Sequence, residues 1–168
     1  YRMTGSAIGK KLRNEPLYNV LNSSHNYGFS NLQARWISGI GNNKVSDDTL
    51  LSMACENLEK RFLVFGLVER FDESLLNIAH HLQWKYPPFY STLNSSTFKE
   101  KTKLEFNENT LKLIEELNQV DLKFYEFAFK RFEEYYQIDN DYLNSFRLRL
   151  KYFQYLHRGY LKIKGLVR

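Results

Sequence analysis

A segment near the middle of the chain combines amide, hydroxyl and lysine side chains in a spacing that suits a phosphate ligand. It contains Asn94, Ser95 and Ser96, followed by Lys99 and Lys101. Hydroxyl and amide groups donate hydrogen bonds to phosphate oxygens, and lysine supplies a point charge. The segment lies in a long connection, and such connections are usually either functional or disordered. The residues alone favour a solvated polar loop and leave a nucleotide-phosphate site as the alternative.

A second set of polar residues lies on a short helix predicted over residues 31–38. Asn31, Gln33 and Arg35 provide two amides and a guanidinium within five residues, and Trp36 is expected to point inward. Arg35 is either a solvated helical charge or a contact to an anion or a sugar. The residue types leave both interpretations open.

The element expected to position these groups is a buried strand over residues 62–67. The run Phe62-Leu63-Val64-Phe65-Gly66-Leu67 is apolar apart from one glycine, which is typical of a strand buried on both faces. An amphipathic helix is predicted directly after it, with Asp72 and Ser74 supplying oxygens to its first N–H groups. A strand that runs into a helix fits an α/β layer arrangement, in which ligands bind at the carboxyl ends of the strands.

Further helices are expected to cover the sheet, because apolar residues recur at helical spacing through much of the chain. A break in the helical pattern is predicted near Asn118. Side chains suited to capping helix N-termini are found at Ser46, Asn107, Asp121 and Asp139.

Composition indicates a folded chain of one domain. The 168 residues are 43% hydrophobic and 16% aromatic, and no apolar run approaches the roughly 20 residues of a membrane span. The net charge of +5 suits phosphate, sulfate or acidic polysaccharide, and equally nucleic acid or no anionic partner at all. The four histidines lack metal-ligand spacing, so no metal is expected.

Three blocks of sequence resemble the carbohydrate sulfotransferase superfamily, which includes heparan- and chondroitin-type, membrane-associated and bacterial enzymes. VFGLVERFDESLLNIAHHLQW, from Val64, is similar to a signature of that family. NLQARWISG, over residues 31–39, looks like its upstream N-x-Q-T-R segment, and LNQVDLKFYEFAFKRF, over residues 117–132, resembles its closing helix. The blocks occur in the family's order and span most of the chain.

The resemblance implies a helix-rich α/β fold, namely the C-terminal part of a P-loop-like sulfotransferase fold with few parallel strands covered by helices. Residues 1–168 would then form a single domain, the C-terminal portion of a sulfotransferase domain. The family's phosphate loop and catalytic base lie upstream of the Asn31 block, and no such segment is found here. No catalytic residue is therefore assigned, and the isolated chain is expected to be inactive.

The resemblance also implies transfer of a sulfuryl group from 3′-phosphoadenosine 5′-phosphosulfate (PAPS) to a carbohydrate hydroxyl. The family includes bacterial and Golgi-resident enzymes, so the compartment stays open. No membrane anchor is found in this chain, and no nucleic-acid partner is expected. The implied contacts are, for the donor, Asn94, Ser95, Ser96, Lys99 and Lys101 and, for the substrate, Asn31, Gln33 and Arg35.

The alternative function is a non-enzymatic basic domain that binds an acidic polymer, either glycosaminoglycan or nucleic acid. Its support is that no Asp or Glu follows Asp141, whereas several lysines and arginines do. Solvated helical lysines and arginines explain that stretch equally well. A purely structural helical domain is the third possibility.

Overall fold

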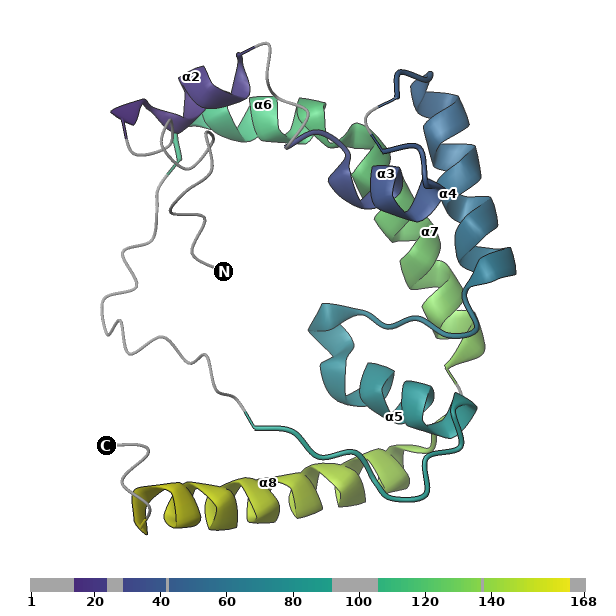
Figure 1. The fold of residues 1–168 in the computed structure, drawn as a ribbon, viewed down its shortest axis with the longest axis vertical. Coiled ribbons are helices and arrows are strands. Elements are labelled where there is room, and N and C mark those ends of the chain that lie inside the picture. The colour runs from purple at the N-terminus through teal and green to yellow at the C-terminus, as the bar shows by residue number, and fades with distance from the viewer. Residues whose placement is uncertain (1–13, 24–28, 42, 92–105, 137, 164–168) are drawn as a thin grey trace. The chain divides into compact units, whose positions relative to one another are not determined.

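The computed structural model describes residues 14–23, 29–41, 43–91, 106–136 and 138–163 (Figure 1). Helices make up 71% of this part of the chain, and it contains no strand. The chain divides into two compact units. One comprises Tyr1–Arg61 and Thr102–Ala128, and the other comprises Phe62–Lys101 and Phe129–Arg168. None of the helices in the described ranges is long and apolar enough to cross a membrane.

The first unit is built from paired helices. Helix α3 packs on α4, and α2 packs on α6. The buried apolar residues of this unit are Val20, Leu21, Ala34, Leu50, Ala54, Leu58, Val120 and Phe124. The bounds are α2 Leu17–Leu21, α3 Leu32–Ser38, α4 Asp47–Arg61, α6 Glu108–Leu117 and α7 Gln119–Tyr135, of which residues 119–128 belong to this unit.

The second unit contains the short 3₁₀ helix η2 (Val68–Arg70), α5 (Phe71–His81), the rest of α7 and α8 (Asn140–Ile163). Helix α5 packs on α8. Leu75, Tyr90 and Ile138 are partly buried against the centre of that contact. The centre consists of Leu76, Leu143, Phe146 and Leu150.

Three predicted helix starts are confirmed, because each is made by a local side-chain cap. Ser46 Oγ accepts a hydrogen bond from the Thr49 N–H at 3.2 Å, and Asn107 Oδ1 accepts one from the Thr110 N–H at 2.8 Å. Asp139 Oδ1 accepts from two N–H groups in the first turn of α8, at 2.8 and 3.1 Å. The break between α6 and α7 also lies where it was predicted.

The predicted α/β fold with parallel strands is wrong. Residues 62–67 have no regular secondary structure and pair with no strand in the described chain. Phe62 and Leu63 are 42% and 72% exposed, and only Leu67 is buried. A strand buried on both faces needs neighbouring strands to bind its N–H and C=O groups and to cover its side chains. The described chain supplies helices instead, so the apolar run stays irregular and partly exposed.

Two predicted side-chain positions are also corrected. Asp72 and Ser74 do not cap α5, because no side chain binds at its N-cap. Both side chains reach other parts of the second unit. Trp36 was expected to point inward but is 74% exposed, since Ala34 and Ser38 occupy the buried face of the short helix α3.

Candidate functional site

Asn31 and Asp121 exchange hydrogen bonds between the first turns of α3 and α7. Asn31 Oδ1 accepts from the backbone N–H groups of Val120 at 3.0 Å and Asp121 at 3.2 Å. The Asp121 carboxylate accepts from the N–H groups of Gln33 at 3.1 Å and Ala34 at 2.8 Å. Each helix is therefore capped by a side chain of the other helix. Asp121, predicted to cap its own helix, caps α3 instead.

Asn31 is buried at this junction, and its backbone is hydrogen-bonded as well as its side chain. The residue is 6% exposed, and its own N–H donates to Asn118 Oδ1 at 3.2 Å. Its φ of 48° lies in the left-handed region, which asparagine adopts more readily than most residues. An asparagine at this position satisfies both the backbone angle and two N–H groups at the start of α7 that have no partner within the helix.

The three predicted substrate residues, Asn31, Gln33 and Arg35, lie together at this junction. Arg35 Nε donates to the carbonyl of Ser30 at 3.2 Å, and its Nη1 donates to the carbonyl of Gly41 at 3.2 Å. The guanidinium therefore binds backbone carbonyls both before and after α3. Gln33, by contrast, is exposed. These bonds give Asn31 and Arg35 structural roles, and their contact with a substrate stays a prediction.

The predicted donor contacts Asn94, Ser95, Ser96, Lys99 and Lys101 lie outside the described residues. Their assignment to PAPS stays a prediction from the resemblance.

The second unit contains a tight turn at the start of α5. Ser74 Oγ accepts a hydrogen bond from the Leu67 N–H at 2.8 Å and donates one to the Leu67 carbonyl at 3.0 Å. A Cβ atom added to Gly66 would lie 2.5 Å from the Ser74 Cβ. The close approach explains the glycine, and the buried hydroxyl satisfies both backbone groups of one extended residue.

Arg70 connects this turn to the end of α7. Its Nε donates to Glu73 Oε2 at 2.6 Å, and its guanidinium also forms an ion pair with Glu133. The Arg70 Cζ atom lies 5.2 Å from the ring centroids of both Phe132 and Tyr136, within cation–π range. The Arg70 guanidinium is therefore held between two carboxylates and two aromatic rings.

Asp72 forms a second link, between α5 and α8. It accepts hydrogen bonds from the Tyr90 hydroxyl at 2.6 Å and from Arg147 Nε at 3.0 Å. Burial and the hydrogen bond to the Asp72 carboxylate raise the pKa of Tyr90 to about 12. The Tyr90 phenol is therefore protonated at neutral pH and acts as a hydrogen-bond donor.

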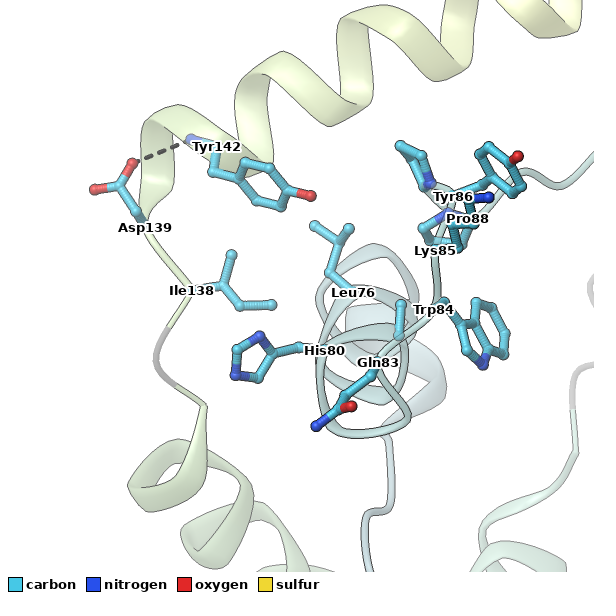
Figure 2. A pocket seen from close by; sticks show the side chains of 12 residues that line it. Leu76, His80, Gln83, Trp84, Lys85, Tyr86, Pro88, Ile138, Asp139 and Tyr142 are labelled. Atoms are coloured by element: carbon cyan, nitrogen blue, oxygen red, sulfur yellow. Dashed lines mark hydrogen bonds between the residues drawn. The ribbon is translucent and has the colours of Figure 1, made fainter.

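A hollow of about 740 Å³ opens between α5, the segment that follows it and the start of α8 (Figure 2). Figure 2 shows the Tyr142 ring and the Leu76 side chain directed into it, with Tyr86 and Pro88 across from them. The volume lies within the range of small-molecule sites. The polar and aromatic side chains of the lining include His80, Gln83, Trp84, Lys85, Asp139 and Tyr142.

The hollow offers both aromatic faces and hydrogen-bonding groups. Trp84 and Tyr142 are each 48% exposed. Within the described chain, the Lys85 ammonium forms no ion pair, and Asp139 Oδ2 accepts no hydrogen bond. A sugar ring has C–H faces that pack on aromatic rings and hydroxyls that bind amide and carboxylate groups. The hollow therefore combines aromatic rings with hydrogen-bonding groups of both charges.

The sequence predictions did not include this hollow. From the sequence alone, the segment Trp84-Lys85-Tyr86-Pro87-Pro88-Phe89-Tyr90 is predicted only to be extended, because it contains two prolines. Its density of aromatic rings beside two prolines was the available signal, because rigid aromatic segments are frequent in binding sites. The other walls come from α5 and α8, and the spacing of residues does not show that these helices meet here.

No known protein-family profile, curated protein or solved structure matches this chain.

Proposed function

We propose that this protein takes part in the transfer of a sulfuryl group from PAPS to a hydroxyl of a carbohydrate. The chain would correspond to the C-terminal portion of such an enzyme, as the order of its three sequence blocks implies. In the reaction, the S–O bond to the bridging phosphosulfate oxygen breaks and a bond from sulfur to the acceptor oxygen forms. The acceptor proton passes to a base, and cations stabilise the leaving phosphate.

The observation that carries the proposal is the hydrogen-bond exchange between Asn31 and Asp121. These residues belong to two different blocks of the resemblance, and the sequence alone does not relate them. Each caps the helix of the other through two backbone N–H groups. Two unrelated chance similarities would not be expected to supply matching halves of one structural junction, so this supports treating the blocks as one pattern.

The hollow beside Trp84 and Tyr142 supports a carbohydrate acceptor. It combines two half-exposed rings with the Gln83 amide, the Lys85 ammonium and the Asp139 carboxylate. We propose that the acceptor sugar lies there. The donor contacts remain Asn94, Ser95, Ser96, Lys99 and Lys101, as the resemblance implies.

The proposal is tested by titrating the chain with adenosine 3′,5′-bisphosphate, the product of the donor, and following thermal unfolding. Binding to the folded state should raise the unfolding temperature saturably. A Ser95→Ala/Ser96→Ala variant should lose this shift, whereas Lys112→Gln, at an exposed position of α6, should keep it. Adenosine 5′-monophosphate is the ligand control. The absence of any saturable shift would contradict the donor site.

The basic-polymer alternative predicts a different result. A polyanion binder should retain heparin and lose that affinity steeply as salt rises, because binding releases counterions. It should show no saturable shift with the bisphosphate. The chain alone is expected to transfer no labelled sulfate to polysaccharide, since it lacks a segment resembling the phosphate loop.

A further inference from the structure

A second hollow, of about 550 Å³, lies along one face of α8 in the same unit. Phe146, Arg149, Leu150 and Phe153 recur at the spacing of a single helical face and form one side of it. The segment at Phe89 forms the other side. The hollow therefore combines an apolar helical stripe with one cationic side chain.

The apolar lining is partly buried and partly open. Phe146 and Leu150 are 2% and 6% exposed and form the floor. Phe89 and Phe153 are 48% and 52% exposed, and their rings meet edge to face at a centroid distance of 5.8 Å. Open aromatic faces beside a buried apolar floor favour a hydrophobic ligand.

Arg149 supplies the charge. Its Nε donates to the Ser145 carbonyl at 3.3 Å, and its Cζ lies 5.9 Å from the Tyr142 ring centroid. Arg149 has no carboxylate partner among the described residues, whereas Arg70 and Arg147 each pair with carboxylates. A guanidinium without an anionic partner at the edge of an apolar hollow complements a bound anion.

We propose that this hollow binds a small amphiphile with one negative charge, of the class of medium-chain carboxylates. The alkyl chain would lie over Phe146 and Leu150 and against the edge-to-face pair of Phe89 and Phe153 rings. The carboxylate would pair with Arg149. The ligand class follows from the combination of an apolar lining with a single cation, and the proposal is independent of the sulfotransferase proposal.

The test is calorimetric titration of the full chain with dodecanoate below its micelle concentration, using dodecanol as the neutral ligand of equal chain length. One dodecanoate molecule is expected to bind per chain, with an affinity at least tenfold higher than that of dodecanol. Arg149→Gln should lower the affinity for dodecanoate at least tenfold and change the affinity for dodecanol by less than twofold. Lys151→Gln, at an exposed position on the same helix, should change neither affinity by more than twofold.

A second variant tests the apolar part of the site. Phe153→Ala removes a half-exposed ring, so the variant should still fold. It should lower the affinities for dodecanoate and dodecanol by a similar factor. Equal affinity for dodecanoate and dodecanol, equal effects of the Arg149 and Lys151 changes, or binding without saturation would each overturn the proposal. Circular dichroism of every variant confirms that the helices are retained.

Discussion

At the scale of single residues, several polar side chains that the sequence suggested for ligand contact or local capping bind backbone groups elsewhere in the protein. Asn31 caps α7, Asp121 caps α3, and Ser74 holds both backbone groups of Leu67. Each bond satisfies a backbone group that would otherwise lie buried or at a helix end without a partner. A polar residue in a signature is therefore no sufficient indication of ligand contact.

Replacing Asn31 with alanine tests this structural role. The change removes the acceptor for two N–H groups at a buried position and places alanine at a left-handed φ. We expect the free energy of unfolding to fall by about 1–3 kcal/mol in urea denaturation. Asn43→Ala is the matched control, since Asn43 is exposed. It should change the free energy of unfolding by no more than about 0.5 kcal/mol. Equal losses in the two variants would refute the capping role.

At the scale of elements, short irregular segments hold the second unit together as much as its helices do. The turn at Gly66 is closed by Ser74 of α5, and Arg70 of η2 joins α5 to the end of α7. Asp72 then joins α5 to α8 through Arg147. The segment over residues 66–74 is therefore joined to both the end of α7 and α8.

Two glycine substitutions should change the free energy of unfolding in opposite directions, because a Cβ would be crowded at Gly66 in the turn and not at Gly159 in α8. Gly66→Ala would place a Cβ against the Ser74 Cβ, and it should destabilise the chain by about 1–3 kcal/mol. Gly159→Ala, in α8, adds a Cβ that meets no described atom within 4 Å apart from its chain neighbours and its own helix backbone, and it should stabilise the chain by up to about 1 kcal/mol. Thermal or urea unfolding of both variants measures the difference. The turn geometry would be wrong if Gly66→Ala were as stable as the parent protein.

At the scale of the whole molecule, the described chain is largely helical, and its stability depends on contacts between the helices and the irregular segments that join them. Tyr90 contributes through its bond to Asp72, and Gln154 of α8 donates to the Tyr90 carbonyl at 3.2 Å. Burial also raises the pKa of Tyr136. Both phenols therefore hold their protons more tightly in the folded chain than in the unfolded one.

These shifts predict a loss of stability at alkaline pH. The unfolded Tyr90 releases its proton near its ordinary pKa of 10.0, while the folded residue keeps it to about 12. The stabilisation is complete below about pH 10 and declines as the pH rises through 12, because the unfolded state then binds fewer protons. In urea titrations across this range, the stability advantage of the parent over Tyr90→Phe should shrink. Tyr155→Phe, at an exposed position of α8, is the control, and an advantage that stays constant with pH would contradict the assignment.

The helix starts at Ser46, Asn107 and Asp139 were predictable from the sequence, because a cap binds N–H groups only two or three residues away. The helical spacing of apolar residues likewise predicted α4, α6 and α8, since the period is a local property. The amino-acid sequence by itself thus determined where most helices lie and that they have apolar faces.

Only the tertiary structure decided what the apolar run at residues 62–67 becomes, which helix Asp121 caps and which side chains surround the two hollows. An apolar run predicts burial, but a strand forms only where neighbouring strands accept its hydrogen bonds, and the described chain provides none. Asn31 and Asp121 are 90 residues apart, and the hollows combine residues of α8 with the segment after α5. Such partners are determined by which surfaces pack together, and that information is distributed over the whole chain.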